Sequence, residues 1–281
     1  MYPLSPREKF CDFWLQPMTR WGKLIYRDVC YQRLPWDTVL PQPLSNRWKK
    51  LEKALAEKFE VPRSIAIFEE RINDIQLHAF GDSSIEGTCA AVYTVVHQNC
   101  GVSQGLIAAK SRLAKKNLTT PRLELVSADM ATTLVDNVKN AIRFPVTSVF
   151  RWLDSTTAMY WIKGNGSYKQ FVENRRRKIN HKNYITWKHV ATAQNPADIG
   201  SRGCLPNALT GFWLKGLEWL PFPGRWPEDI VLCSSKEAEQ EAKVRDNLCT
   251  SAEIQEDDMD ELLQKFTFWN LYASLVGHED L

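Results

Sequence analysis

Apolar and polar residues alternate in the middle of the chain, and this alternation predicts β-strands. In residues 75–83, apolar and other side chains take turns with a period of two, which places one set on each face of a strand. Residues 88–97 are rich in β-favouring types, a turn follows at 99–101, and residues 102–109 can return as a third strand. These three segments predict an antiparallel meander.

The following residues change to helical spacing and then return to strand spacing. A helix is predicted after Thr119-Thr120-Pro121, because its apolar residues recur at intervals of three and four: Leu123, Val126, Met130, Leu134, Val138 and Ile142. The nearly unbroken apolar run 146–153 is typical of a buried parallel strand. Further elements are predicted in this order: a helix after Ser155, a basic helix over 170–181, a strand over 184–190 and a helix after Asn195-Pro196. The pattern therefore predicts an α/β fold with a mixed five-stranded sheet and flanking helices.

Residues outside this region predict three further segments. Residues 1–70 are rich in Trp, Pro and Arg and predict a small helical segment ahead of the domain at 71–204. Its clearest helix is expected over 45–59, capped by Ser45 or Asn46, with one face formed by Trp48, Leu51, Leu55 and Phe59. Residues 205–235 predict an extended, surface-packing Trp/Pro-rich connector. Residues 236–281 predict an acidic tail with a short amphipathic helix (Met259, Leu262, Leu263, Phe266 and Trp269).

Composition excludes several classes of protein. With 44% hydrophobic residues among 281, the chain is not predominantly disordered. Its apolar runs are far shorter than the ~20 residues of a membrane helix, and the first twenty residues lack the pattern of a secretory signal. We therefore expect an intracellular protein, in cytoplasm or nucleus, without membrane contact. The seven cysteines are odd in number and include no Cys-x-x-Cys pair, so reduced thiols are expected rather than disulfides or a zinc site.

The net charge of +3 conceals a strong asymmetry. Residues 236–281 hold four basic and twelve acidic residues, a net charge of −8, which leaves +11 on residues 1–235. A basic body favours a polyanionic partner, and the acidic tail could mask it. Six basic residues in two stretches are the candidates for nucleic-acid contact: Lys110, Arg112, Arg122, Arg175, Arg176 and Lys178. The alternative for 175–178 is an exposed helical face.

Four acids occupy positions where a site can form. Asp82 and Asp154 end predicted strands, and Glu124 and Asp198 lie in the first turns of predicted helices. Individually, Asp154 could cap a helix and Asp198 could complement a helix dipole. Together, four clustered carboxylates would need cations, and oxygen ligands favour two Mg²⁺ ions, or Mn²⁺. Such a pair of ions can promote hydrolysis of a phosphodiester.

Six strings in the middle of the chain form a distinctive set: HAFGDSS (78–84), AAKSRLA (108–114), TTPRLEL (119–125), WLDSTTAMYWI (152–162), FVENRRRKI (171–179) and WKHVATAQNPADIGSRG (187–203). Together they resemble the ribonuclease H domain, with its preceding connection segment, of BEL/Pao-type LTR retrotransposon polyproteins. Flanking similarity extends from PLSPREKF near residue 3 to GFWLKGLEWL at 211–220. The resemblance implies an endonuclease that cleaves RNA in RNA–DNA hybrids with Asp82, Glu124, Asp154 and Asp198 as its metal-binding catalytic acids. It also implies the polymerase domain of the polyprotein as a possible partner.

One departure from the family pattern and two rival functions stay open. Some ribonucleases H have a mobile His before the last helix, whereas the loop 191–194 here has none and His189 lies earlier. The first rival is a decayed or domesticated copy that keeps the fold and binds nucleic acid or protein without cleavage. The second is a transposase or integrase of the same superfamily. The position of Glu124 as the second acid, rather than the third, disfavours it.

Overall fold

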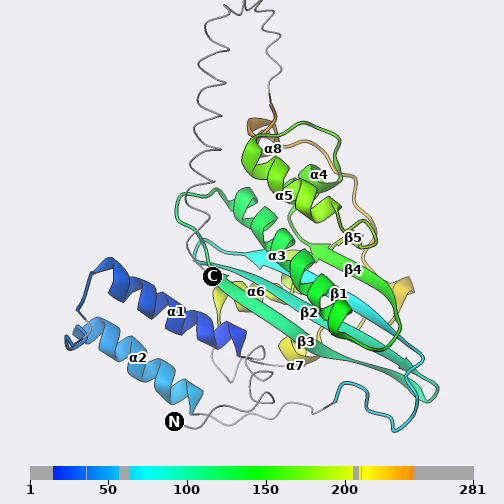
Figure 1. Cartoon of the computed structure of the whole chain (residues 1–281), viewed down its shortest axis with the longest axis horizontal. Coiled ribbons are helices and arrows are strands. Elements are labelled where there is room, and N and C mark those ends of the chain that lie inside the picture. The colour runs from blue at the N-terminus through cyan, green and yellow to red at the C-terminus, as the bar shows by residue number, and fades with distance from the viewer. Residues whose placement is uncertain (1–14, 36, 57–63, 205–208, 210, 244–281) are drawn as a thin grey trace, which may run out of the picture. The chain divides into compact units, whose positions relative to one another are not determined.

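The computed structural model describes residues 15–35, 37–56, 64–204, 209 and 211–243, which lie in one compact unit. Within these residues a five-stranded sheet has the order β3-β2-β1-β4-β5 (Figure 1). Its strands are β1 (Asp74–Ser83), β2 (Gly87–Gln98), β3 (Gly101–Leu113), β4 (Val146–Leu153) and β5 (Thr186–His189). β1, β2 and β3 form an antiparallel meander, and β4 runs parallel to both β1 and β5. The predicted mixed sheet is confirmed.

Helices cover both faces of this sheet. On one face, α3 (Thr120–Ala141) packs across β1 and β2, and it also contacts α4 (Thr156–Lys163) and α5 (Gln170–Asn180). On the opposite face lie α6 (Ala197–Arg202) and α7 (Gly211–Lys215) (Figure 1). The alternation along β1 explains this arrangement, because Leu77 packs with the α3 core while Phe80 packs with Trp213 of α7.

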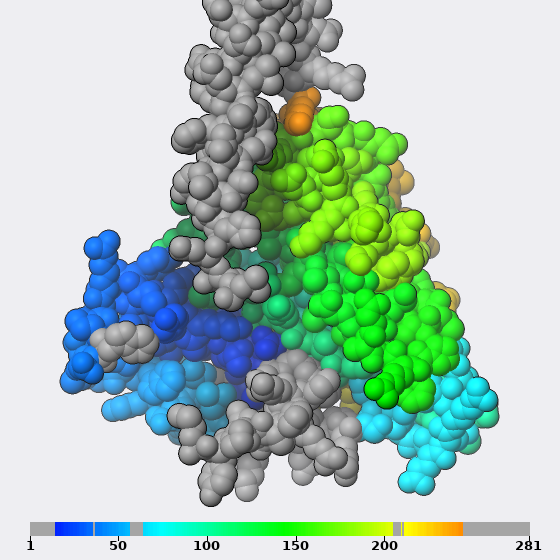
Figure 2. Space-filling view, in the orientation of Figure 1, coloured from blue at the N-terminus to red at the C-terminus, as the bar shows by residue number. Residues whose placement is uncertain are grey.

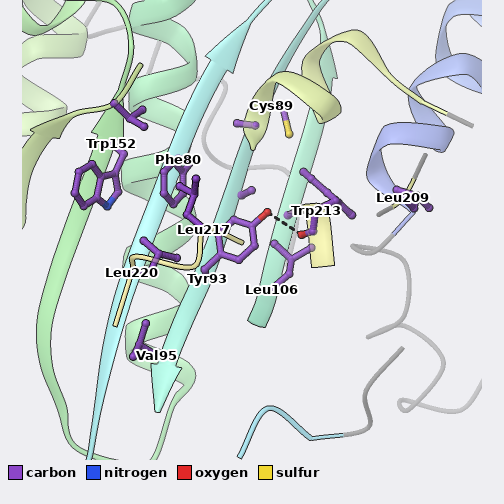
Figure 3. Close-up of a cluster of buried hydrophobic side chains, with 14 of the residues drawn as sticks. Phe80, Cys89, Tyr93, Val95, Leu106, Trp152, Leu209, Trp213, Leu217 and Leu220 are labelled. Atoms are coloured by element: carbon purple, nitrogen blue, oxygen red, sulfur yellow. Dashed lines mark hydrogen bonds between the residues drawn. The ribbon is translucent and has the colours of Figure 1, made fainter. Parts of the chain in front are cut away.

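The second face is closed by the Trp/Pro-rich segment. Trp213 is fully buried, and Leu217 and Leu220 pack beside Phe80 and Tyr93 of the sheet (Figure 3). The Tyr93 hydroxyl donates a 2.8 Å hydrogen bond to the Trp213 carbonyl oxygen, which satisfies both buried groups. The segment was expected as an extended surface connector, but the described part contributes a helix, a 3-10 turn at Pro223–Arg225 and core side chains. The domain divisions near residues 70, 204 and 235 stay predictions.

The N-terminal segment forms two helices, α1 (Gln16–Tyr31) and α2 (Gln42–Leu55). α2 starts three residues before the expected position, since Pro43 fits in a first turn where no N–H donor is needed. Neither predicted cap is used, and the predicted apolar face is partly wrong: Trp48 and Leu55 are each 47% exposed, whereas Leu51 is buried and Phe59 lies outside the described residues. α2 buries only the residues that meet its neighbours, and a single-helix pattern does not identify those neighbours.

The C-terminal segment is described only at its start. α8 (Lys236–Gln240) begins at Ser235, whose hydroxyl accepts a 3.1 Å hydrogen bond from the amide of Ala238. The amphipathic helix expected between Met259 and Trp269 lies outside the described residues. Among the helices that are described, none is long and apolar enough to cross a membrane.

Candidate active site

The fold brings the ends of β1 and β4 to the same level of the sheet. Phe80 of β1 is paired with Trp152 of β4 in parallel register, and Asp82 and Asp154 each follow two residues later. Glu124 lies near the start of α3, and Asp198 is the second residue of α6. We call these four acids the carboxylate site. Asp82 and Asp154 lie at the same edge of the sheet, because parallel strands end at one edge.

The charges of the four acids act on the pKa values of Asp82 and Glu124. The pKa of Asp82 is raised to about 6: burial is the largest cause, a hydrogen bond from Ser201 opposes it, and the charges of Asp154 and Asp198 add to it. The pKa of Glu124 is likewise raised to about 7, mainly by burial and also by the charges of Asp154 and Asp82, while a hydrogen bond from Ser155 opposes the shift. Negative charge is therefore concentrated at this end of the sheet in a partly desolvated setting.

Polar residues around α6 hold two of the acids. The Ser201 hydroxyl donates to Oδ2 of Asp82, and Nε of Arg202 donates to Oδ1 of Asp198 at 2.6 Å. Asn195 fixes the start of α6, since its side-chain amide donates to the carbonyl of Gly81 at 2.9 Å. Side chains of the segment 195–202, which contains α6, therefore connect this helix to β1.

Two structural explanations were open, a helix cap for Asp154 and a complement to a helix dipole for Asp198, and the structure supports only the second. Ser155, and not Asp154, caps α4, because its hydroxyl accepts a 3.1 Å hydrogen bond from the amide of Ala158. The capping explanation of Asp154 is therefore wrong. Asp198 does lie in the first turn of α6 and is paired with Arg202, so a structural role for it stands beside a functional one. His189 is also near, with Nε2 3.3 Å from the backbone carbonyl oxygen of Asp154.

The carboxylate oxygens of the four acids are suitable ligands for a divalent cation, although the side chains are not gathered around one position. Among the described residues, no three His, Cys, Asp or Glu side chains form a group that could hold a metal ion. Hydrogen bonds to Ser201, Arg202 and Ser155 occupy the carboxylates instead. Four oxygen-donor acids, two of them with raised pKa values, nevertheless match what Mg²⁺ prefers, because a cation would relieve their repulsion.

A buried arginine from α1 supports this site and was not identified from the sequence. Arg20 is 3% exposed; it donates to the backbone carbonyl of Arg202 and, at 2.8 Å, to Oε2 of Glu86. Gly203 leaves room for α1, since a Cβ there would lie 2.6 Å from Nε1 of Trp21. α1 therefore fixes the end of α6. Only a contact across 182 residues reveals this role, and no local pattern encodes it.

Four of the six predicted nucleic-acid residues line a single groove. Lys110, Arg112, Arg175 and Lys178 surround a cavity of about 270 Å³ between β3, α3 and α5, which we call the basic groove. Lys115 also lines it. Asp129 is an acidic residue of its lining, and its Oδ1 lies 3.4 Å from Nζ of Lys178. The groove is therefore predominantly cationic.

The other two predicted residues have structural partners outside the groove. Nε of Arg122 donates to Oε1 of Glu241 at 2.7 Å, just beyond α8. Arg176 donates to the carbonyl of Gly164 at 2.7 Å and pairs with Glu173 at 3.4 Å. In both cases the guanidinium group is already engaged, which weakens the prediction that these two residues contact nucleic acid.

Comparison with known proteins identifies one family. The model of the Pao retrotransposon-like RNaseH-like domain matches residues 13–155, which include Asp82, Glu124 and Asp154 but not Asp198. No curated protein matches the chain.

Solved structures with some similarity include RNase H1 from the halophilic archaeon Halobacterium salinarum NRC-1, at 15% identity, 50% coverage of this chain, 97% of that chain and a TM-score of 0.30. LC11-RNase H1 in complex with an RNA/DNA hybrid has 17% identity, 48% and 99% coverage and a TM-score of 0.33. The foamy viral protease-reverse transcriptase, also with an RNA/DNA hybrid, has 13% identity, 54% and 25% coverage and a TM-score of 0.25.

Proposed function

Because the chain belongs to the Pao retrotransposon-like RNaseH-like domain family, we propose that it is a metal-dependent endonuclease that cleaves the RNA strand of RNA–DNA hybrids. The observation that carries the proposal is the carboxylate site. Asp82 and Glu124 are kept in a setting that disfavours their charged forms and raises their pKa values. Titratable groups with perturbed pKa values that lie close together are typical of functional sites.

The four acids of the carboxylate site would hold two Mg²⁺ ions. Metal ions held there would supply an activated water and stabilisation of the leaving oxygen of the phosphodiester. The chain's own groups keep the acids in place: Ser201 orients Asp82, and Ser155 donates to Glu124. Asn195 and Arg20 hold the two ends of α6, so Asp198 is positioned from both sides.

The basic groove would bind the phosphates of the substrate. Lys110, Arg112 and Arg175 are contributed by β3 and α5, and their charges can replace the counterions of a polyanion. Recognition of a hybrid would depend on the shape of the duplex and on 2′-hydroxyl groups rather than on base sequence. The polymerase domain of the same polyprotein stays a predicted partner.

Cleavage of a labelled hybrid tests the proposal. With Mg²⁺ or Mn²⁺ the chain should nick the RNA strand and leave the DNA strand intact, and EDTA should stop the reaction. Asp82→Asn should abolish cleavage but keep binding, because the basic groove is unchanged. Asp229→Asn is the matched control, since Asp229 is 64% exposed and pairs only with Lys188 among the interactions described. Equal residual cleavage by wild type and Asp82→Asn would contradict the proposal.

The second candidate is a non-catalytic nucleic-acid-binding copy of the fold. It is favoured by one observation: no metal-holding group forms among the described side chains. Under this alternative the chain binds hybrids through the basic groove but cleaves none at any concentration of Mg²⁺ or Mn²⁺. Isothermal titration with Mg²⁺ separates the two, because only the first candidate predicts binding of metal that Asp82→Asn removes.

A further inference from the structure

α1 is fixed against the end of β3 by hydrogen bonds to one residue. Nζ of Lys23 donates to the carbonyl of Ser111 at 2.9 Å, and the amide of Ser111 donates to Oε1 of Gln16 at 2.9 Å. Figure 1 shows α1 beside the β3 side of the sheet, and in Figure 2 the side chains of α1 and α2, in blue, lie together at one side of the view. α1 therefore extends the surface at the end of β3.

This contact forms a second hollow that adjoins the basic groove. The α1 hollow is lined by Gly22, Lys23, Tyr26, Ser111, Arg112 and Leu113. Arg112 and Leu113 also line the basic groove, so both hollows lie at the end of β3. A chain molecule bound at Arg112 in the basic groove would therefore lie beside the α1 hollow.

Positive charge is crowded at this junction. Burial lowers the pKa of Lys23, and the charges of Lys110 and Arg112 lower it further, so three cations act on the same place. The helical segment over residues 16–55 carries eight basic and three acidic residues, a net charge of +5. An anionic group at Arg112 would reduce this repulsion.

The hollow also offers an aromatic surface. Tyr26 is 61% exposed although it lines the hollow, and nearby on the same helix Tyr31 is 57% exposed and has Nζ of Lys116 4.0 Å from its ring centroid. Exposed aromatic rings among basic side chains are typical of surfaces that bind single strands, because unpaired bases can stack on them. A base within a duplex has no free face for such stacking.

We propose that the α1 hollow binds a single-stranded nucleic-acid extension of the hybrid, with a phosphate at Arg112 and a base stacked on Tyr26. The hybrid itself would lie in the basic groove, so this inference rests on the proposed function. It assigns a binding role to α1, which precedes the sheet along the chain.

Fluorescence anisotropy in EDTA tests the inference without cleavage. The probes are a blunt RNA–DNA hybrid, the same hybrid with a single-stranded oligo-dT extension at either DNA end, and oligo-dT alone. At least one extended hybrid should bind wild type about fivefold or more tightly than the blunt hybrid. This factor corresponds to the lower end of the range of binding free energies for the stacking of one base. Tyr26→Ala should remove this gain and leave affinity for the blunt hybrid unchanged.

Two variants control for nonspecific effects. Tyr26→Phe keeps the ring and should keep the gain. Tyr184→Ala removes another exposed tyrosine with a lysine over its ring, Lys139 at 4.2 Å, and should also keep it. Melting curves establish that each variant is folded.

The outcomes separate this inference from the proposed function. A chain that binds the blunt hybrid but gains nothing from either extension overturns the inference and leaves the proposed function standing. A gain that persists in Tyr26→Ala also overturns it. A chain that never cleaves a hybrid, yet binds oligo-dT in a Tyr26-dependent manner, overturns the nuclease proposal and supports the α1 site.

Discussion

Replacing Asp82 by asparagine should stabilise the metal-free protein at neutral and alkaline pH. Asp82 is 6% exposed, and its pKa rises from 3.8 to about 6, first because of burial and then because of Asp154 and Asp198. Since one pKa step is about 1.4 kcal/mol, keeping this carboxylate charged costs about 3 kcal/mol of folding free energy. An asparagine removes that charge, and its side-chain oxygen can still accept the hydrogen bond from Ser201.

The pH dependence has a definite sign. A carboxyl group whose folded pKa is raised contributes most to stability below its unfolded value, and this contribution is lost as pH rises through the folded value. Wild type should therefore lose stability relative to Asp82→Asn mainly between pH 3.8 and about 6, and the difference should be constant once Glu124, which is coupled to Asp82 and has a pKa of about 7, is also charged. At pH 8 the variant should melt about 6–12 °C higher in EDTA.

Thermal and urea unfolding in EDTA, from acid to alkaline pH, measures this difference directly. Comparing the two proteins at each pH cancels the titration of groups that do not interact with Asp82, whereas Glu124, whose pKa the Asp82 charge raises, adds to the difference. Asp229→Asn, at an exposed ion pair, should change stability by no more than about 0.5 kcal/mol. Added Mg²⁺ should stabilise wild type and have little effect on Asp82→Asn. A variant that is less stable than wild type at pH 8, by an amount independent of pH, would refute the reasoning.

Three further substitutions test the contacts around the site. Glu241→Gln should release Arg122 for phosphate contact, because it removes the charge that pairs with the guanidinium group. Hybrid affinity should rise about two- to fivefold at low salt, and the gain should be lost at high salt. Unchanged anisotropy at low salt would show that Arg122 lies outside the interface. Gly200→Ala should destabilise the fold by about 2 kcal/mol or more in urea unfolding, because a Cβ there would lie 2.1 Å from Sγ of Cys89. Cys89→Ala in combination should recover part of this loss, and no recovery would contradict the clash. Arg20→Met should lower the free energy of unfolding by about 2 kcal/mol or more in the same assay, and it should lower cleavage more than hybrid binding. A parallel loss of cleavage and binding would argue for general unfolding.

The sequence determined the order of the elements around the sheet. Alternation in 75–83, the continuous apolar run at 146–153 and the Thr-Thr-Pro helix start are all local signals, and the structure contains β1, β4 and α3 at these positions. The placement of Asp82 and Asp154 was equally accessible, because a residue at or just after the carboxyl end of a strand lies at the edge of the sheet whatever the strand packs against.

Tertiary structure alone decided which partner each side chain received. Arg122 looked like a phosphate ligand, but its guanidinium pairs with Glu241, 119 residues away. Trp213 was expected in a surface connector and instead closes the core over Tyr93. Arg20 carried no local signal, yet it holds the end of α6. Sequence spacing encodes which faces of an element are apolar, whereas the pairing of buried and charged groups depends on which surfaces meet once the chain has folded.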